Sequence, residues 1–375
     1  MTTNDDPGAL TCAPAADLDD NTISELTISG DPAQVPAGAL DAALAHAAET
    51  GAERVVTSVP AGSAATEWLS REGFTKAGQV ARWTRAAGAA KPDQVEGRFE
   101  VRPYAPGDYT ADALVGLAAA TMGTLVFTAP ELLTVRDNTL RTAVFGGTTG
   151  QVFAAFDGWM PAGWIVLSGI ENGSADIVLA QARPDLAGQG MLGQLLAPVV
   201  TLADEQGIAL RVSVDPDREK ELTEALGSFG FTEGTPTEVW QRTLPVTAQP
   251  AETHEVRREL EPLRGTEVAL VTTFKKDGTG KGTPVGITVG PDRAFFTTRS
   301  QSWKVKRIAN NKNVVAAPSD PMGTPTGASV ELTARRMSDA EVLELRKGVQ
   351  YHVWRLIYHV AYADEPVTYE LTPRA

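Results

Sequence analysis

The apolar residues near the N-terminus alternate between two spacings, the period of two typical of strands and the period of three to four typical of helices. Short runs rich in Ile, Val and Thr are separated by stretches rich in Ala and Leu. This pattern predicts strand–helix–strand–helix–strand, over residues 23–29, 37–50, 53–60, 64–74 and 78–86. The preceding residues 1–21 are polar and rich in Ala and Asp, and we expect them to be mobile.

The same order of elements recurs further along the chain. We expect strands and helices to alternate over residues 174–184, 191–207, 209–216, 218–231 and 237–244. Both copies contain a helix that ends at Gly followed by Phe (Gly73 and Gly230), and then a strand that contains Trp (Trp83 and Trp240). We interpret this as an internal repeat whose first copy is truncated to about half a unit. Chance recurrence, which is common in α/β proteins, is the alternative.

The remaining segments set the domain boundaries. Residues 112–141 have a helical pattern that is broken at Pro130, and two strands flank an Asp-Gly turn at 157–158. Residues 88–97 and 244–255 are typical of linkers. We therefore expect a multidomain chain with a mobile N-terminus (1–21), an incomplete α/β domain (22–87), a complete α/β domain (98–244) and a C-terminal domain (254–375).

Length and charge narrow the classes of function. A chain of 375 residues is too long for one ordinary domain, and 42% apolar against 21% charged residues is typical of a globular protein. Residues 254–375 hold 18 Lys and Arg against 14 Asp and Glu, whereas residues 1–253 hold 15 against 33. The acidic part argues against nucleic acid as a partner, because contacts with phosphate dominate that affinity.

Cysteine and histidine usage points to the interior of the cell. Cys12 is the only cysteine, so no disulfide can form within the chain. No apolar run approaches the ~18 residues of a membrane span, and residues 1–15 lack the pattern of a signal peptide. The histidines have no zinc-site spacing. We expect a cytoplasmic protein without a metal and without a membrane partner.

Residues 297–307, TTRSQSWKVKR, combine four cations and four hydroxyls directly after an apolar strand. Short O–H and N–H donors, mobile positive charge and a helix dipole all favour an anion such as phosphate. The alternative is the solvated face of a surface helix, which is the commoner origin of a basic run.

The order of elements around this segment resembles the pyridoxamine 5′-phosphate oxidase-like family, and within it the branch that binds the deazaflavin F420. The matching residues are Leu270, Thr273, Asp277, Gly278, Pro284, Val285, Thr298, Ser302, Lys304, Ile308, Asn311 and Val314. The resemblance covers about residues 257–375. It implies a mostly antiparallel split β-barrel, a homodimer and an oxidoreductase without a catalytic dyad, since the cofactor carries the redox chemistry.

The same resemblance implies a cofactor site. Thr298, Ser302 and Lys304 would lie near the phosphate, and F420 is favoured over FMN by the short Ser-x-Lys form. Haem, with His352 or His359 as ligand, or no cofactor are the remaining alternatives. The implied cofactor-binding residues are Pro284, Val285, Thr297, Thr298, Arg299, Ser302, Lys304, Lys306 and Arg307.

A glycine-rich loop between a predicted strand and helix is the second chemical signal. The loop contains Gly188, Gly190 and Gly193. Because glycine has no side chain, backbone N–H groups at the start of the helix can converge on a phosphate group. The loop lacks the Gly-Lys-Ser/Thr ending of a nucleoside-triphosphate loop, and its G-x-G-x-x-G match is weak evidence alone.

Residues 98–244 resemble the GNAT acyltransferase fold, in which the amides of an R/Q-x-x-G-x-G/A loop hold the pyrophosphate of acetyl-CoA. Ala187 and Leu192 depart from that pattern; the residues that match it are Pro184, Gly188, Gly190, Leu195 and Leu196. With the repeat, the arrangement resembles the tandem of mycothiol synthase, with residues 22–87 as a degenerate, structural half. The implied acyl-CoA-binding residues are Ala182, Gly188, Gln189, Gly190 and Gly193.

Catalytic residues are harder to predict. Acyl transfer to an amine needs a base, and Glu171 and Asp176 are the nearest carboxylates, although a solvated turn explains them more simply. Three hypotheses stay open. The chain is a fusion of an acyl-CoA domain with an F420-dependent reductase of a small molecule, a pair of non-catalytic ligand sensors, or an acetyltransferase whose barrel serves dimerisation.

Overall fold

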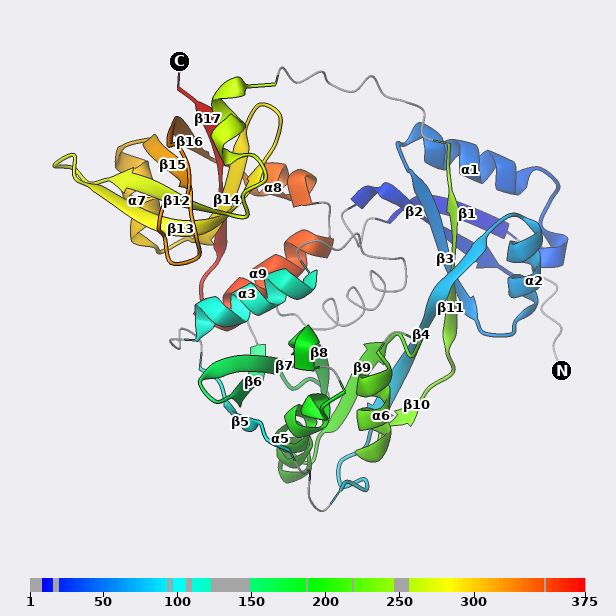
Figure 1. Ribbon diagram of the computed structural model, residues 1–375. Coiled ribbons are helices and arrows are strands. Elements are labelled where there is room, and N and C mark those ends of the chain that lie inside the picture. Colours follow the sequence, from blue (N-terminus) through cyan, green and yellow to red (C-terminus); the bar gives the residue numbers. More distant parts are fainter. Residues whose placement is uncertain are drawn as a thin grey trace. The chain divides into compact units, whose positions relative to one another are not determined.

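The computed structural model describes residues 9–15, 20–92, 95, 97–105, 110–122, 149–186, 188–217, 219–245, 256–346 and 349–374. The chain divides into two compact units, whose elements are labelled in Figure 1. Unit 1 comprises Met1–Thr247 and Lys347–Ala361, and unit 2 comprises Ala248–Arg346 and Tyr362–Ala375. No helix in these described ranges is long and apolar enough to cross a membrane.

The first copy of the repeat has the element order that its apolar pattern predicts. β2 (Asp20–Ser29) and β3 (Arg54–Pro60) pair in parallel, and α1 (Ala39–Glu49) connects them. α2 (Ala64–Arg71) then leads to β4 (Thr75–Arg85). The helices bury Leu40, Leu44, Trp68 and Leu69 against β2 and β3 in one apolar core.

An additional strand lies inside the segment 1–21, for which the sequence predicts mobility. β1 (Ala9–Ala15) pairs antiparallel with β2. Leu10 and Cys12 pack against the core of the first copy, whereas Thr11 between them is exposed. This period of two is that of a half-buried strand, so the signal was present but short.

The second copy repeats the order after an N-terminal extension. The predicted helix over 112–141 is observed as far as Met122, and the rest of that prediction lies outside the described residues. The elements are β5 (Glu100–Pro103), α3 (Ala111–Met122), β6 (Thr149–Asp157), β7 (Met160–Ser168), β8 (Ser174–Ala182), α5 (Met191–Gln206), β9 (Ala209–Val214), α6 (Lys220–Ser228), β10 (Thr232–Glu233) and β11 (Thr237–Thr243).

The two copies exchange their last strands. β11, which ends the second copy, lies between β3 and β4 of the first, and β4 pairs in turn with β9 of the second. The strands described in unit 1 therefore form one continuous sheet, in the order β1-β2-β3-β11-β4-β9-β8-β7-β6-β5, with β10 beside β4 (Figure 1). Each copy depends on the other for a strand in the middle of its sheet.

Matching helix ends support the internal repeat. Gly73 and Gly230 both have a left-handed backbone, with φ of 79° and 76°, and each follows a helix of the same place in its copy. The next residue in each case donates its N–H back into the helix, Phe74 to Leu69 at 3.0 Å and Phe231 to Leu226 at 3.1 Å. Glycine is favoured here because a side chain strains a left-handed residue.

The copies differ at the start of their first helices. At the C-terminal ends the two helices correspond, because an N–H just past each helix, of Ala52 or Ile208, donates to the carbonyl oxygen five residues earlier, of buried Ala47 or Ala203, at 3.0 Å. However, α1 has 11 residues and α5 has 16. The first copy therefore lacks the opening turn that α5 presents beside the glycine loop.

Arg85 attaches the exchanged strand β4 to the second copy. Its guanidinium has no exposed area and donates to both carboxylate oxygens of Asp204 in α5, at 2.7 and 3.1 Å. It also donates to the carbonyl oxygens of Phe229 and Ala89. The hydrogen bond from Arg85, aided by the Gly88 N–H, holds the pKa of Asp204 at about 2, below its ordinary 3.8.

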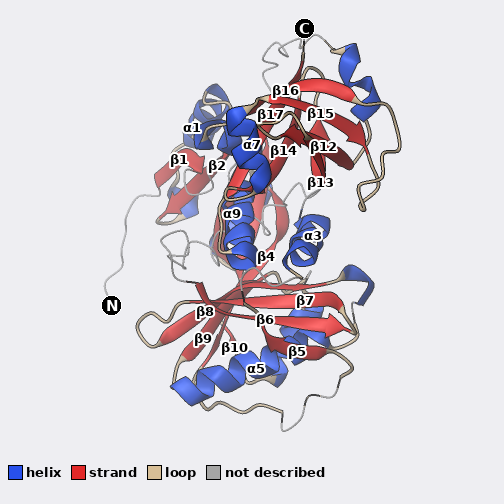
Figure 2. Ribbon diagram, turned by 90° about the vertical axis from the view of Figure 1, so that its left-hand side faces the viewer, coloured by secondary structure: helices blue, strands red, loops and turns tan. Residues whose placement is uncertain are grey.

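In unit 2 the described strands close into an antiparallel barrel, which confirms that part of the predicted fold. Their order is β12-β13-β14-β17-β16-β15. Every second residue of β12 is buried, as expected for a strand with one face in a core. α7 lies outside the barrel against β12 (Figure 2). The elements are β12 (Val268–Phe274), β13 (Gly280–Val289), β14 (Ala294–Arg299), α7 (Trp303–Asn310), β15 (Asn313–Pro318), β16 (Val330–Arg336), α8 (Asp339–Arg346) and β17 (Pro366–Pro373).

The helix between α8 and β17 groups with unit 1 rather than with the barrel. α9 (Val349–Tyr362) falls almost entirely within Lys347–Ala361. The buried hydroxyl of Tyr104, at the end of β5, donates to the carbonyl oxygen of Ala361 at 2.8 Å. This grouping of residues from the range 254–375 could not be predicted from the sequence, because local patterns do not identify distant partners.

Candidate functional site

β8 and β9 separate part-way along their length. They pair in parallel only from Ser174 to Asp176 on β8 and from Ala209 to Arg211 on β9. Beyond that point β9 pairs with β4, and β8 continues to Ala182 paired with β7 alone. No strand of the described chain therefore covers the edge of β8 over residues 177–182 on the side of β9.

An ion pair between a buried carboxylate and a half-buried guanidinium lies at the point of separation. Asp176 is 1% exposed, and its two carboxylate oxygens accept from Nε and Nη2 of Arg211 at 2.9 and 2.8 Å. Its N–H donates to the hydroxyl of Ser168 at 2.8 Å. The solvated-turn interpretation is thus wrong for Asp176, because the parallel neighbour β9 brings a cation to it. It holds for Glu171, which is exposed and bridges to Ser174.

β8 also bulges just past the point of separation. Val166 of β7 faces Leu179, and Leu167 faces Ile177, so Val178 has no opposite residue on β7. An extra residue in a strand redirects its peptide groups and increases the local twist. The Val178 peptide therefore lies at the open edge without a place in the β7 ladder.

The glycine loop follows β8 and leads into α5. Gly188 and Gly190 have left-handed backbones with φ of 75° and 72°, and Gly190 caps α5 without a side-chain hydrogen bond. A Cβ at either position would meet nothing within 4 Å, so these glycines face open space. Glycine is needed at both positions for the backbone conformation. The N–H of Gln189 between them donates to the carbonyl oxygen of Leu186 at 3.3 Å.

Close packing fixes where α5 begins. Met191, the first residue of α5, is fully buried. A Cβ on Gly163 of β7 would lie 2.7 Å from the Met191 sulfur and 2.6 Å from the carbonyl oxygen of Gln181. Only glycine at position 163 lets the helix start this close to β7 and β8.

The predicted acyl-CoA-binding residues lie together around this loop. Ala182 ends β8 opposite Gly163, and Gln189 is exposed beside Gly188 and Gly190. Gly193 lies in the first turn of α5, where a Cβ would make only ordinary contacts. Of the two departures from the loop pattern, Ala187 lies outside the described residues, and Leu192 packs against the apolar core.

Sequence reasoning missed one polar residue at the loop. The N–H of Gly188 donates to Oε2 of Glu221, near the start of α6, at 2.7 Å. Nothing in the spacing of Glu221 in the sequence distinguishes it from Glu224 on the same helix. Only the tertiary arrangement of α5 and α6 brings it to the glycine loop.

In unit 2 the predicted cofactor residues lie near the start of α7. The hydroxyls of Thr298 and Ser302 are 3.4 Å apart, and the hydroxyl of Thr297 lies 3.0 Å from that of Thr368. Ser302 caps α7 without a side-chain hydrogen bond to it. Pro284 and Val285 lie on β13, and the side chain of Val285 belongs to the barrel core.

The cations of this segment have neighbours in their own unit. Arg299 lies over the ring of Tyr362 at 4.7 Å, and Lys306 lies over the ring of Trp303 at 4.8 Å. Arg307 donates to the hydroxyl of Thr273 at 3.3 Å. These contacts place each of the three charges beside an aromatic ring or a hydroxyl group. They are compatible both with a site for an anion such as phosphate and with the solvated face of a surface helix.

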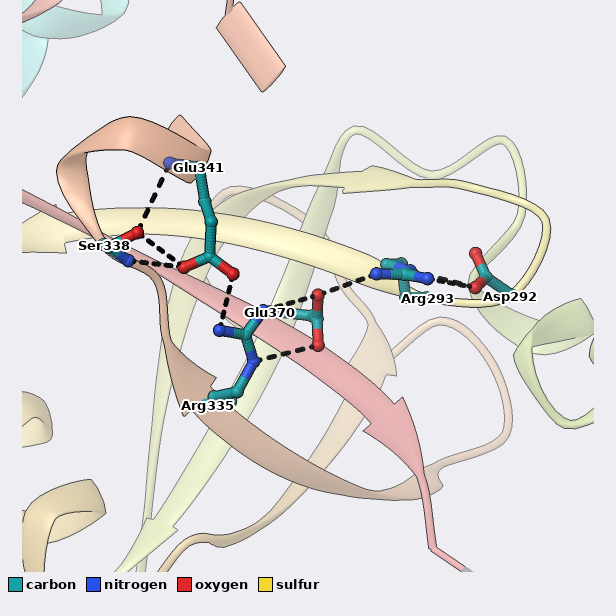
Figure 3. A network of polar contacts seen from close by, with 6 residues as sticks. All are labelled: Asp292, Arg293, Arg335, Ser338, Glu341 and Glu370. Atoms are coloured by element: carbon teal, nitrogen blue, oxygen red, sulfur yellow. Dashed lines mark hydrogen bonds and ion pairs between the residues drawn. The ribbon is translucent and has the colours of Figure 1, made fainter. Parts of the chain in front are cut away.

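A polar network around Glu370 in unit 2 connects strands of the barrel to α8. Glu370 accepts from Arg293 and Arg335, and Arg335 also donates to Glu341 (Figure 3). Ser338 and Glu341 form a capping box at the start of α8, with the Ser338 N–H donating to Glu341 at 2.7 Å. Hydrogen bonds from Ser338, and then from Arg335, hold the pKa of Glu341 at about 2. Every charged side chain in Figure 3 is paired with another, so this network is better explained as a structural link between the strands and α8 than as a ligand site.

Comparison with known proteins does not assign the chain to a family. No family model and no curated protein matches it. Among solved structures, a GCN5-related N-acetyltransferase from Sphaerobacter thermophilus is 14% identical over 63% of this chain and 76% of that one, with a TM-score of 0.44. A tandem GNAT protein from the clavulanic acid biosynthesis pathway is 14% identical over 65% and 81%, with a TM-score of 0.38. The heme storage protein HutZ from Vibrio cholerae is 11% identical over 32% and 92%, with a TM-score of 0.26.

Proposed function

We propose that unit 1 binds acyl-CoA in the opening between β8 and β9. One observation carries the proposal: the two strands separate after Asp176 and Arg211, next to the bulge at Val178, and β8 then leads into the glycine loop. An uncovered strand edge offers N–H and C=O groups to an extended ligand that contains amides, such as the pantetheine arm. The amides at the start of α5 suit its diphosphate.

Acyl transfer to an amine is the second part of this proposal. The Val178 amide would donate to the acyl carbonyl and stabilise the negative charge that develops on its oxygen. A base must also take a proton from the amine, and Asp176 does not suit that role because Arg211 occupies both of its oxygens. We therefore rank acyl-CoA binding ahead of N-acetyltransferase activity.

The test is calorimetric titration of the full chain with acetyl-CoA. Gly190→Trp would fill the open space at the loop, so we expect it to abolish binding. Gly38→Trp is the matched control, because Gly38 caps α1 in the first copy, has φ of 81° and likewise faces open space. Binding that survives Gly190→Trp would remove the loop from the proposal. Release of free CoA thiol with added amines would measure transfer.

For unit 2 we propose an F420-dependent oxidoreductase, with FMN as the alternative cofactor. The adjacent hydroxyls of Thr298 and Ser302 at the start of α7 support it, since they and the Ser302 cap fit a phosphate. Lys304, Lys306 and Arg307 would offset the charge of an acidic tail. The bound cofactor would supply hydride chemistry to a small-molecule substrate, and these residues would only hold it.

Fluorescence titration with F420 and with FMN tests the cofactor. We expect F420 to bind and Lys304→Ala to weaken its binding by about tenfold or more, as loss of a charge-assisted contact should. Lys312→Ala is the control, because Lys312 is exposed beyond the end of α7. Tight binding of FMN together with no binding of F420 would contradict F420 as the cofactor and favour FMN.

A homodimer formed through the barrel is part of the same proposal. Trp303 and Met322 in unit 2 are 70% and 88% exposed, which is unusual for large apolar side chains. Sedimentation of the wild type and of Trp303→Ser would test it. A wild-type monomer at tens of micromolar protein contradicts the dimer.

A further inference from the structure

The carboxylate of Glu221 is bound to the glycine loop. Its Oε2 accepts from the N–H of Gly188 at 2.7 Å. Its other oxygen, Oε1, is buried and has no hydrogen-bond partner in the part of the chain that the structure describes. The loop whose amides we propose for a diphosphate therefore already holds one anionic group of the protein.

The position of Glu221 explains how this carboxylate is held with so few partners. It lies in the first turn of α6, where the helix dipole favours negative charge. The Gly188 amide adds one charge-assisted hydrogen bond. Because one of its oxygens is buried without a hydrogen-bond partner, the Glu221 carboxylate is held weakly overall. It stays at the loop only while no stronger acceptor competes for the Gly188 N–H.

The loop has room for a competitor. Gly188 and Gly190 face open space, and α5 begins there without a side-chain cap. A diphosphate would bring more negative charge to the same amides than a single carboxylate does. Two anions cannot share one N–H, and they repel each other at this distance, so occupation by one requires withdrawal of the other.

We propose that Glu221 is an internal competitor of the anionic ligand, which caps the loop in the free protein and must leave it when the diphosphate of acyl-CoA binds. This inference rests on the proposed acyl-CoA function. The apparent affinity is the intrinsic affinity multiplied by the fraction of protein in which the loop is uncapped. Glu221 thereby makes the loop selective for ligands with enough negative charge to displace it.

Two substitutions of Glu221 test the inference, and one substitution of Glu224 serves as the control. Glu221→Gln removes the charge and keeps the shape, and Glu221→Ala removes the contact. Glu224→Gln removes the same charge from an exposed position of the same helix. Thermal melting of each variant checks that it is folded. The ligands are acetyl-CoA and, separately, inorganic pyrophosphate, titrated by calorimetry into the full chain.

We expect both Glu221 variants to bind acetyl-CoA and pyrophosphate about 10- to 100-fold more tightly than the wild type, the range of one hydrogen bond to a charged group. Glu224→Gln should match the wild type. Equal binding by the wild type and the Glu221 variants would overturn the competitor role and leave the acyl-CoA proposal standing. Pyrophosphate binding that is gained on substitution, without any binding of acetyl-CoA, would support the competitor and overturn the acyl-CoA assignment. Absence of binding for either ligand in every variant would overturn both.

Discussion

Arg85 and Asp204 form a two-point ion pair between β4 of the first copy and α5 of the second, with N···O distances of 2.7 and 3.1 Å. Arg85 has no exposed area, whereas the Asp204 side chain is 20% exposed. Asp204 lies near the C-terminal end of α5, and the glycine loop lies at the other end. The first copy has no glycine loop of its own, but it supplies the cation that holds the helix on which that loop depends.

Arg85→Met should lower the free energy of unfolding of unit 1 by about 3 kcal/mol or more, because loss of one partner leaves a partly buried charge and buried carbonyls without donors. Urea unfolding followed by tryptophan fluorescence measures this. Lys76→Met is the control, since the Lys76–Glu238 pair also joins the two copies but is 41% exposed at Lys76. It should cost less than about 1 kcal/mol. Equal losses would show that burial of Arg85 is unimportant.

The same pair should make stability depend on pH. The pKa of Asp204 is about 2 in the folded protein, below its ordinary value of 3.8. A lowered pKa means that the carboxylate stabilises the fold fully above pH ~4, and that this contribution is lost as pH falls from ~4 towards ~2. The difference in unfolding free energy between wild type and Asp204→Asn should therefore shrink over that range. If the difference in unfolding free energy between wild type and Asp204→Asn stayed constant from pH 6 down to about pH 2.5, the lowered pKa of Asp204 would be contradicted.

The two helix-end glycines give a matched pair for separating backbone strain from steric collision. A Cβ on Gly230 would lie 2.3 Å from the carbonyl oxygen of Ala90, whereas one on Gly73 would meet only Arg242 Cζ, at 3.9 Å. Both have a left-handed backbone, so each Ala variant should lose about 1 kcal/mol from strain. Gly230→Ala should lose ~1–3 kcal/mol more, because a backbone atom must move. Equal losses in urea unfolding would mean that the Ala90 segment yields freely.

The helix ends could be predicted from sequence because they depend on local patterns, whereas the barrel was predicted from the resemblance of residues 257–375 to a known family. Gly73 and Gly230 terminate their helices as the Gly-Phe landmarks indicate, and alternation in β12 marks a strand with one buried face. β1 was missed because Leu10 and Cys12 are the only side chains described in this strand that pack against the core. A pattern of two residues does not stand out from a polar segment.

The strand exchange and the contacts of Asp176 and Glu221 could not be predicted in the same way. Which strands pair with β4 is decided by long-range packing, which places β11 on one side of it and β9 on the other. Asp176 follows a turn-forming sequence, yet it is buried because Arg211 lies opposite it on a parallel strand. Pairing of residues so far apart in the chain is a property of the fold and leaves no mark in local composition.

The close approach at Gly163 gives a prediction that links packing to the proposed ligand. A methyl group on Gly163 would collide with the carbonyl oxygen of Gln181 and with the sulfur of Met191, at 2.6 and 2.7 Å. The Met191 sulfur ends a flexible side chain and can move by itself, but the Gln181 carbonyl belongs to the backbone of β8. Relief of the collision must therefore shift β8 where it leads into the glycine loop. Gly163→Ala should therefore weaken acetyl-CoA binding by about tenfold or more, equivalent to ~1.4 kcal/mol.

Lower stability alone is not expected to explain that loss. Gly230→Ala destabilises the same unit at a different helix end, so it should leave acetyl-CoA affinity nearly unchanged when both proteins are titrated well below their unfolding temperatures. Similar losses of affinity in the two variants would show that the glycine loop is not positioned through Gly163. If Gly163→Ala alone loses affinity while its melting temperature matches that of Gly230→Ala, the effect comes from the position of the loop, because stability is then the same in both.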